Sequence, residues 1–365
     1  MQRKNIICFA AGHSGGHIMP CLSIANQFNN CRINFITTNK KLDSDILKNK
    51  NINKHLKLNL DKIPDNFFSI PIFLIKLFSA FIKSFIFLLC NRPDKLITTG
   101  GLVAIPPFLA AKILGINLEI YELNVEPGKA TKFLSKICKN IKICFEETEK
   151  YFNKKPARRS TSQYYPGQTF DFTPGEDGCT LVNYPVRFTD KDKIFNRNEI
   201  LQKLNFNSDK KTILVIGGSQ GSIFLNNIVK EFVIKYKPIN IQIIHQTGIN
   251  EDYKNWQNFY KQYEIKNIIF SFNENVKDFY LASDLILCRS GAGTLAEIIF
   301  FEKLCITIPL QTATTNHQIL NANALARKHP NIVKTIAQPS PEATADVAQN
   351  DVQRIIDSAH KYLNG

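Results

Sequence analysis

The chain lacks the signals of several common protein classes. Its nine cysteines contain no Cys-X-X-Cys pair and lie scattered, several of them within apolar runs. An odd, scattered set of this kind is typical of reduced thiols rather than of a disulfide framework. The chain also has no signal-peptide layout, because its N-terminus enters a strand-like run at once. We therefore expect a cytoplasmic protein.

Motifs for several chemistries are missing as well. There is no zinc-ligand spacing, helix-turn-helix pattern or aromatic RNA-binding motif, so nucleic acid ranks last among possible partners. No stretch matches Gly-X-Gly-X-X-Gly or the Gly-Lys-Ser/Thr ending of a P-loop, which disfavours a dehydrogenase or an ATPase. No acidic pair with metal-ligand spacing stands out. We expect donor binding that needs no metal and no other cofactor.

Two glycine-rich turns are present, and each directly follows an apolar strand-like run. The first occupies 11–17 (Ala-Gly-His-Ser-Gly-Gly-His) and the second 217–221 (Gly-Gly-Ser-Gln-Gly). A helix-like segment follows each turn. Glycines at such a point let the backbone bend sharply and expose the N-terminal amides of the helix to an anion, typically a phosphate. Two such units suggest a ligand held between two domains.

Apolar strand-like runs alternate with helix-like segments, which predicts parallel sheets covered by helices. The predicted strands lie near 4–10, 33–37, 95–99, 117–122 and 141–145, and then near 212–217, 240–245, 267–271, 284–288 and 304–309. A chain of 365 residues can hold two domains of ordinary size. We predict an N-terminal domain over 1–186, a C-terminal domain over 187–348, and a final helix over 349–365 that packs back on the N-terminal domain.

The stretch 154–182 fits this scheme badly, because it is rich in proline and glycine and has little apolar periodicity. We interpret it as a long, irregular loop between the domains. The formal net charge of +15 has two interpretations. It can reflect a compositional bias of the genome, or it can attract anionic partners such as a membrane surface or a diphosphate.

Residues 67–90 form the most apolar segment. Their length approaches that of a membrane span, but Lys76 and Lys83 lie near the middle, and the segment falls between strands of one sheet. The two lysines are seven positions apart and share one helical face. Two interpretations stay open: a helix lying on a membrane with its apolar side chains dipped in, and a buried core helix. We expect the segment to serve each role in part.

Two polar segments of the second half suit a nucleotide sugar. In 288–297, Ser290 or Thr294 can cap a helix whose small first residues let a ligand approach its positive end. Glu297 lies about one turn inside, where a carboxylate can accept hydrogen bonds from the diol of a ribose; a solvated first-turn acid is the plain alternative. In 309–322, amides and hydroxyls suit sugar hydroxyls, although polar loop residues are common.

Together these segments resemble the MurG family, the peptidoglycan N-acetylglucosaminyltransferases that convert lipid I to lipid II. Order and spacing agree over roughly residues 4–325. The matching residues are Ser14-Gly15-Gly16-His17 with Pro20, Thr99-Gly100-Gly101, Glu122-Leu123-Asn124 with Pro127-Gly128, Pro185-Val186-Arg187, Gly217-Gly218-Ser219-Gln220-Gly221 with Asn226, His245-Gln246-Thr247-Gly248, Cys288-Arg289-Ser290-Gly291-Ala292 with Thr294 and Glu297, and His317-Gln318 with Asn321-Ala322.

The resemblance implies a GT-B fold, an α/β architecture of two Rossmann-like, doubly wound domains with an interdomain cleft. It implies inverting transfer of N-acetylglucosamine from UDP-N-acetylglucosamine to lipid I, the undecaprenyl-diphosphate-linked muramyl-pentapeptide, with a new β-1,4 bond. The implied location is the cytoplasmic face of the inner membrane, as a peripheral protein. The implied process is peptidoglycan synthesis, and with it cell wall biogenesis, cell shape and cell division.

Carried over residue by residue, the resemblance also implies a site. Ser219 and its glycines would meet the donor diphosphate near Arg187, Glu297 would hold the ribose, and Gln318 with His317 would face the sugar hydroxyls. The full donor set is Ser14, Gly15, Gly16, Asn124, Arg187, Ser219, Asn273, Gly293, Thr294, Glu297, His317 and Gln318. The acceptor diphosphate would lie against Gly12, Gly15, Gly100 and Gly101. The implied catalytic residues are His17 and Glu297.

His17 is the candidate base for the acceptor hydroxyl, because a histidine titrates near the working pH. The alternative for His17 is structural, an imidazole bonded to the backbone of the turn. Helix amides and Arg187 would stabilise the leaving diphosphate in place of a metal.

The chain departs from the family pattern mainly on the acceptor side. His13 stands where a glycine is usual, and Tyr121 and Leu123 replace a histidine and a glutamine near Asn124. Residues 102–104 lack the usual tyrosine and serine, and the two residues before Pro185 are altered. The acceptor is therefore a weaker prediction than the donor. Alternatives are another GT-B enzyme, such as a diacylglycerol glycosyltransferase or a UDP-sugar epimerase, and a non-catalytic UDP-sugar-binding protein.

Overall fold

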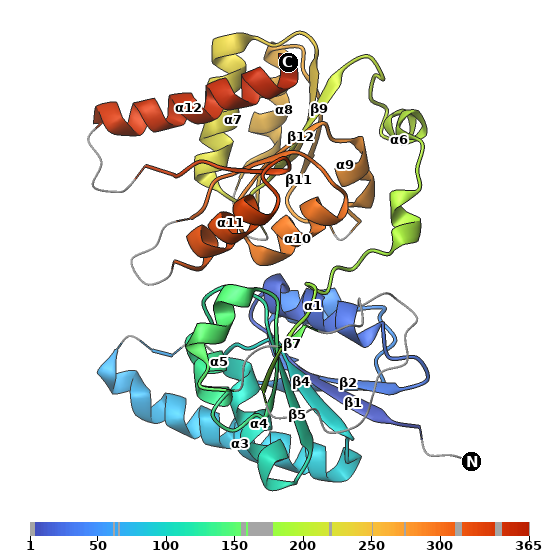
Figure 1. Cartoon of the computed structure of the whole chain (residues 1–365), viewed down its shortest axis with the longest axis vertical. Coiled ribbons are helices and arrows are strands. Elements are labelled where there is room, and N and C mark those ends of the chain that lie inside the picture. The colour runs from blue at the N-terminus through green and yellow to red at the C-terminus, as the bar shows by residue number, and fades with distance from the viewer. Residues whose placement is uncertain are drawn as a thin grey trace. The chain divides into compact units, whose positions relative to one another are not determined.

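The structure is a computed structural model that describes residues 4–60, 63–64, 66–154, 158–159, 178–218, 221–249, 251–273, 275–310, 316–339 and 345–364. The chain divides into two compact units, Met1–Arg187 and Phe188–Gly365. Each unit contains one parallel sheet with helices on both of its faces (Figure 1). The predicted domain boundary, after residue 186, lies one residue before this division.

The sheet of the N-terminal unit has eight strands. From edge to edge they are β3 (Lys54–Leu58), β2 (Arg32–Thr38), β1 (Ile6–Ala10), β4 (Lys95–Thr98), β5 (Asn117–Glu122), β6 (Asn140–Ile143), β8 (Gly178–Leu181) and β7 (Arg158–Arg159). The chain moves outward from β1 in one direction and then returns to place β4 on its other side. Such a switch point leaves a crevice at the carboxyl ends of the two strands, where open α/β sheets bind ligands.

Alternate residues of these strands face opposite cores. Ile7 and Phe9 pack with α1 (Gly15–Ala25) and α2 (Lys41–Leu47), whereas Cys8 and Ala10 pack with the helices of the other face. Those helices are α3 (Ile70–Asn91), α4 (Ile105–Ile113) and α5 (Lys129–Leu134). Short 3-10 turns are η1 (Phe67–Ser69), η2 (Leu102–Ala104), η3 (Glu146–Tyr151) and, in the second unit, η4 (Asp190–Lys193).

The C-terminal unit repeats this design with six strands. In spatial order they are β11 (Lys266–Phe270), β10 (Ile241–Gln246), β9 (Lys211–Ile216), β12 (Leu285–Cys288), β13 (Cys305–Thr307) and β14 (Val333–Thr335). The switch point lies between β9 and β12. The helices are α6 (Arg197–Lys203), α7 (Ile223–Tyr236), α8 (Tyr253–Gln262), α9 (Lys277–Ala282), α10 (Ala292–Phe300), α11 (His317–Lys328) and α12 (Ala345–Asn364).

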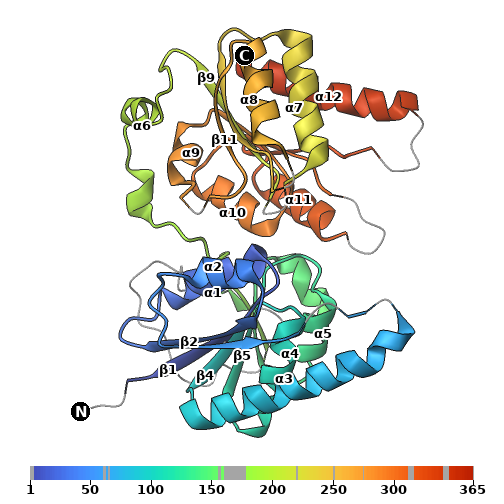
Figure 2. The ribbon, with the colours of Figure 1, turned by 180° about the vertical axis from the view of Figure 1, so that it is seen from behind.

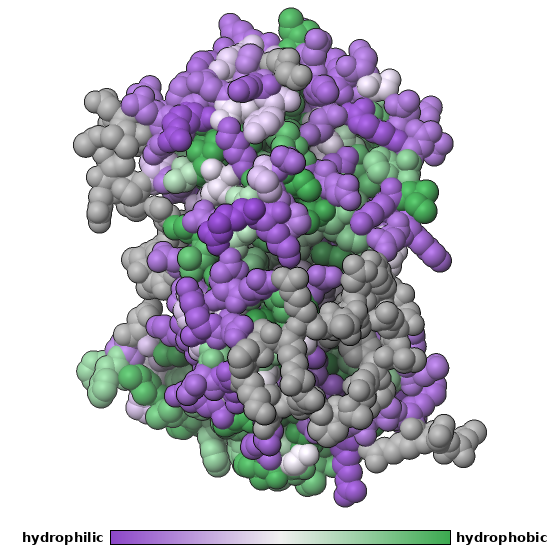
Figure 3. Space-filling model, in the orientation of Figure 1, coloured by the Kyte–Doolittle hydropathy of each residue, from purple (hydrophilic) through white to green (hydrophobic). Residues whose placement is uncertain are grey.

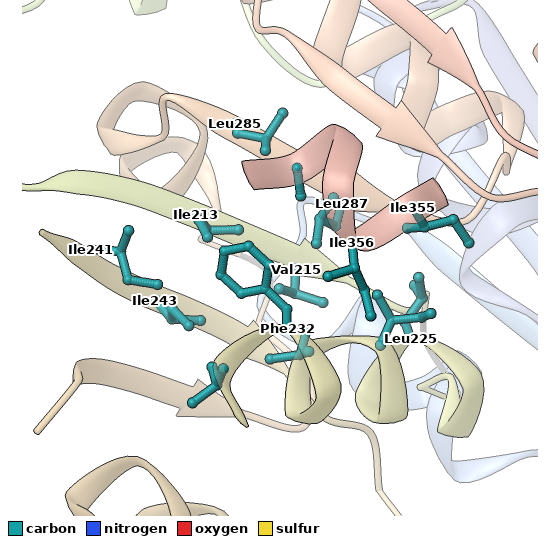
Figure 4. Close-up of a cluster of buried hydrophobic side chains, with 14 of the residues drawn as sticks. Ile213, Val215, Leu225, Phe232, Ile241, Ile243, Leu285, Leu287, Ile355 and Ile356 are labelled. Atoms are coloured by element: carbon teal, nitrogen blue, oxygen red, sulfur yellow. The ribbon is translucent and has the colours of Figure 1, made fainter. Parts of the chain in front are cut away.

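The final helix, α12, packs on α7 within the C-terminal unit. Ile355 and Ile356 lie in one core with Leu225 and Phe232 of α7 and with the sheet residues Ile213 and Val215 (Figure 4). The sequence prediction placed 349–365 against the N-terminal domain instead. The apolar stripe of α12 is taken up by the sheet of its own unit, which corrects that expectation.

Every predicted strand is found, with ends that shift by a few residues at most. Four additional strands of the described residues were not predicted: β3, β7, β8 and β14. Each of these strands is short and carries few apolar residues, so the apolar pattern that predicts a strand was too weak to detect. The predicted loop over 154–182 is corrected in two places, since Gly178–Leu181 pairs with β6 and Arg158–Arg159 pairs with β8. Residues 155–157 and 160–177 of that prediction lie outside the described residues.

The apolar segment 67–90 becomes η1 and α3. Ala80, Ser84 and Leu88 are buried along one face of α3, which packs beside α4 (Figures 1 and 2). Ile72, Ile75 and Phe78 point away from that core and are 61%, 70% and 66% exposed. Among the described residues, 67–91 is the one helical stretch long and apolar enough to cross a membrane by length and composition. It contributes to the core of the unit as well as to its surface.

Candidate functional site

The glycine-rich turn of the N-terminal unit connects β1 to α1 and is held by a buried carboxylate. Oδ2 of Asp43 accepts hydrogen bonds from the backbone amides of His13 and Thr38, each at 3.1 Å, and from the Thr38 hydroxyl. A Cβ on Gly12 would lie 2.8 Å from the same oxygen. The turn therefore requires glycine at 12. Asp43 was not predicted as a site residue, because nothing in its local sequence links it to a turn 30 residues away.

His17 lies in the first turn of α1 and faces the end of β4. Its Nδ1 is 3.1 Å from the carbonyl oxygen of Thr99, and the Thr99 hydroxyl donates to the carbonyl of His17 at 2.9 Å. A carbonyl can only accept, so Nδ1 carries the proton and Nε2 of the neutral ring keeps its lone pair. Burial lowers the pKa of His17, and this outweighs the opposing effect of the Thr99 carbonyl.

The two glycines after Thr99 lie against the same imidazole. Gly100 and Gly101 have φ of 97° and 88°, in the region that favours glycine. A Cβ on Gly101 would lie 3.7 Å from Cδ2 of His17. The structure thus brings the predicted residues Gly12, Gly100, Gly101 and His17 together at the switch point of the sheet.

Asn124 follows β5 and is positioned by a second buried acid. Its backbone amide and its Nδ2 both donate to Oε1 of Glu122, at 2.9 and 3.2 Å. Thr148 donates to the carbonyl oxygen of Asn124 at 3.0 Å. Burial raises the pKa of Glu122 to about 7, although these hydrogen bonds oppose the shift. Glu122 matched a family motif in the sequence but was given no role there.

The turn of the C-terminal unit connects β9 to α7 through closely packed backbone. A Cβ on Gly221 would lie 2.6 Å from the carbonyl oxygen of Thr247 and 2.5 Å from Cα of Gly248. Gly218 has φ of 87° and only open space around its missing Cβ. At Gly218 the positive φ, and not a lack of space, is what favours glycine. Ser219, predicted for the donor diphosphate, lies outside the described residues.

A neutral histidine holds the far side of this turn. Nε2 of His245 donates to Oδ1 of Asn226 at 3.1 Å, and Nδ1 pairs with the Tyr260 hydroxyl at 2.8 Å. Asn226 in turn donates to the carbonyl of Thr247 at 3.0 Å. Burial lowers the pKa of His245 to about 3, so the ring is neutral at physiological pH. This network keeps Thr247 against Gly221 and was not predicted.

The predicted nucleotide residues lie around the switch point of the second sheet. Oε1 of Gln318 accepts hydrogen bonds from the amides of Ser290, 3.2 Å away, and Leu310, 2.9 Å away. These bonds fix the plane of its amide group between the ends of β12 and β13. Gly291, Gly293 and Thr294 occupy the N-terminal end of α10, which begins at Ala292.

Glu297 and His317 are fixed in the same region. Oε2 of Glu297 accepts from the hydroxyl of Tyr280 at 2.9 Å, so α9 orients the carboxylate that was predicted for the ribose. Nδ1 of His317 is buried and has no hydrogen-bond partner in the part of the chain that the structure describes. Asn273, after β11, accepts from the amide of Asn275 at 2.8 Å in a local turn.

Ser14, Gly15 and Gly16 lie in the first unit, and Arg187 is its last residue. Their contact with a donor held by the second unit stays a prediction. Over the described residues, no group of three or more His, Cys, Asp or Glu side chains could hold a metal ion.

Comparisons with known proteins agree with this arrangement. Residues 7–143 match the glycosyltransferase family 28 N-terminal domain, and residues 212–353 match the glycosyltransferase family 28 C-terminal domain. A UDP-N-acetylglucosamine–N-acetylmuramyl-(pentapeptide) pyrophosphoryl-undecaprenol N-acetylglucosamine transferase of Pelagibacter ubique is 31% identical over 100% of this chain and 92% of its own length. The transferase of the same name from Flavobacterium psychrophilum is 30% identical over 91% of this chain and 85% of its own length.

Solved structures show the same fold. The crystal structure of Acinetobacter baumannii MurG matches with a TM-score of 0.64 and 22% identity, over 98% of this chain and 100% of that one. A UDP-GlcNAc 2-epimerase from Neisseria meningitidis, bound to UDP-GlcNAc, matches with a TM-score of 0.56 and 13% identity, over 98% of this chain and 100% of that one. These likenesses establish the GT-B fold. Together with the matches of both halves and of the full-length relatives, they place this chain in glycosyltransferase family 28, as a member of the MurG family.

Proposed function

We propose that this chain transfers N-acetylglucosamine from UDP-N-acetylglucosamine to lipid I and so forms lipid II for peptidoglycan. The observation that carries this proposal is that an anion-binding type of turn stands at the switch point of each sheet, within a chain that matches such transferases along its whole length. Two diphosphate-bearing substrates need two such turns. An epimerase of the same fold acts on one nucleotide sugar and needs no lipid-linked acceptor.

The C-terminal unit is the donor-binding half in this proposal. Glu297, oriented by Tyr280, accepts hydrogen bonds from the ribose, and the turn at 217–221 with Ser219 binds the diphosphate. Gln318 has its oxygen committed to two backbone amides, so its Nε2 is left to donate to a sugar hydroxyl. Asn273, Gly293, Thr294 and His317 complete the donor pocket, together with Arg187, Asn124 and 14–16 from the first unit.

The N-terminal unit is the acceptor-binding half, and His17 is its base. The acceptor hydroxyl attacks the anomeric carbon, the bond from that carbon to the diphosphate oxygen breaks, and UDP leaves with the electron pair. Nε2 of His17 takes the proton of the hydroxyl, because Nδ1 is already bonded to the Thr99 carbonyl. Gly12, Gly15, Gly100 and Gly101 hold the acceptor diphosphate through their backbone.

The same half docks on the cytoplasmic face of the inner membrane through η1 and α3. Phe67 and Phe68 are 79% and 85% exposed, and Ile75 and Phe78 continue this apolar surface. Figure 3 shows hydrophobic atoms gathered over α3. Lys83 is exposed on the same helix and can meet anionic headgroups. A lipid-linked acceptor remains in the membrane, so the enzyme has to bind there peripherally.

UDP release in the presence of lipid I, of diacylglycerol and of no acceptor tests the proposal. We expect release with lipid I only, and its loss in His17→Ala. Release with diacylglycerol but not with lipid I would contradict the proposed acceptor. If neither acceptor works while UDP-N-acetylglucosamine still raises the melting temperature, the chain is a UDP-sugar-binding protein without transferase activity.

A further inference from the structure

Arg289 is a buried cation whose partners among the described residues are all neutral. It directly follows β12 and is 8% exposed. Its Nη1 donates to the carbonyl of Ile308 at 3.1 Å and to Oε1 of Gln338 at 2.7 Å, and its Nε donates to Oγ of Ser222 at 3.0 Å. The ring of Phe224 lies 5.3 Å from the guanidinium carbon. Among the described residues, no carboxylate forms an ion pair with it.

Burial of an uncompensated charge is costly, so a group of this kind requires an explanation. Burial lowers the pKa of Arg289 only to about 10, and the side chain therefore stays charged at neutral pH. An anionic ligand near the guanidinium of Arg289 would supply the negative charge that the described residues do not provide.

Ser222 connects this cation to the glycine-rich turn of the C-terminal unit. It is partly exposed and is the residue directly before α7. Its Oγ accepts hydrogen bonds from the amide of Leu225 at 3.3 Å and from Nε of Arg289 at 3.0 Å. A serine hydroxyl has two lone pairs and one proton. Both lone pairs are used, so the hydroxyl can only donate to a further partner.

The hydroxyl of Ser222 lies at the N-terminal end of α7, which is the end of a helix that favours anions. The amides of the first turn of α7 carry partial positive charge. The backbone nitrogen of Ser222 would lie 2.7 Å from a Cβ on Gly217, so the serine packs directly onto the turn proposed to hold the diphosphate. A bond from Arg289 to Oγ also polarises the hydroxyl and makes it a stronger donor.

We propose that Ser222 donates its hydroxyl proton to the diphosphate of the UDP-sugar and that Arg289 behind it supplies the compensating positive charge. This inference rests on the proposed function, since it assigns a further binding residue to the donor site. Charge builds up on the diphosphate as UDP leaves, so the same pair stabilises the departing UDP.

A purely structural role for Ser222 makes a different prediction. Capping α7 and pairing with Arg289 both require only an acceptor, and an aspartate would serve both well. An aspartate has no proton to donate and would repel a diphosphate. Ser222→Asp therefore separates the two roles: the structural role predicts intact or improved ligand binding, and the proposed role predicts its loss.

The experiment compares the full-length wild type with Ser222→Asp, Ser222→Ala and Ser222→Thr. Affinities for UDP are measured by calorimetry and those for uridine, which lacks the phosphates, by ligand-observed NMR. We expect Ser222→Asp to keep the melting temperature and uridine affinity of the wild type but to bind UDP at least about tenfold more weakly. Ser222→Ala also weakens UDP binding, and Ser222→Thr restores most of it because it keeps the hydroxyl.

Unchanged UDP affinity in Ser222→Asp would overturn the inference, and so would an equal loss of uridine and UDP affinity. A wild type that does not bind UDP at all would instead overturn the proposed function, which distinguishes the two failures. Steady-state kinetics give a second readout: the KM for UDP-N-acetylglucosamine rises in Ser222→Asp, whereas the KM for lipid I does not.

Discussion

The two glycine-rich turns have the same position in their sheets but are held by groups of opposite charge. The carboxylate of Asp43 binds the amides around the first turn, whereas the guanidinium of Arg289 binds the serine that ends the second. Burial lowers the pKa of His17, and the charge of Asp43 opposes that shift as the smallest of its causes, so the ring stays neutral and its Nε2 can accept a proton. A buried cation favours a diphosphate. The proposed roles thus assign proton transfer to the turn of one unit and the leaving anion to the turn of the other.

The largest expected effect separates these two roles. His17→Ala should lower the rate of transfer to lipid I by roughly 10²–10⁴-fold, while the affinity for UDP, measured by calorimetry, stays within about twofold because His17 is not among the residues proposed to bind the donor. A loss of UDP affinity in His17→Ala that matches its loss of rate would contradict the separate roles of the two turns.

The pH dependence of kcat/KM tests the same histidine. A base has to be unprotonated, and burial lowers the pKa of His17 below its ordinary value of 6.5. The rate should therefore stay level at neutral pH and fall only as the pH drops through that lowered pKa. A fall already centred above 6.5 would show that another group limits the reaction.

Gly221→Ala tests how rigid the second turn is. The new Cβ would lie 2.5 Å from Cα of Gly248, at a residue with φ of 78°. We expect a loss of stability on the order of 3 kcal/mol and weakened UDP binding, measured by thermal melting and calorimetry. Gly128→Ala is the control, because its Cβ meets nothing within 4 Å. Equal melting of the two variants would contradict the packing described above.

Membrane binding should depend on the acceptor half alone. Ile75→Asp combined with Phe78→Asp removes two exposed apolar side chains of α3, and burial of one such side chain stabilises by about 1.5–3 kcal/mol. Flotation with anionic vesicles should therefore fall more than about tenfold. Ile239→Asp, at an even more exposed isoleucine of the C-terminal unit, should leave flotation unchanged. Equal flotation of the wild type with neutral and anionic vesicles would refute the contribution of the lysines.

The smallest effect concerns His13, which has φ of 77°, a backbone conformation that favours glycine. His13→Gly should relieve strain of about 1 kcal/mol and raise the melting temperature of this unit by roughly 2–4 °C. A lower melting temperature would show that contacts of the imidazole outweigh the strain.

The sequence was sufficient for most of the strands, because buried strands are continuous apolar runs, and for both turns, because glycines directly follow those runs. The sequence was insufficient for edge strands such as β3 and β14, because their lysines interrupt the apolar pattern that predicts a strand. It also misplaced α12, since an amphipathic helix shows which face is apolar but not which sheet covers that face.

Most of the candidate residues could be identified from motifs, but the residues that position them could not. Asp43, Tyr280 and His245 each act across a long stretch of sequence, through contacts that exist only once the strands are in order. A lone acid, tyrosine or histidine in an apolar segment carries no sign of its partner. Arg289 was visible within a motif, but only the fold shows that it has no acidic partner in the part of the chain that the structure describes.

The location of UDP in a crystal of this protein soaked with UDP-N-acetylglucosamine tests the division of roles most directly. We predict the diphosphate within hydrogen-bond distance of the turn that ends at Ser222, with the ribose against Glu297. A diphosphate bound at the turn between Gly12 and His17, with the second turn empty, would contradict the account.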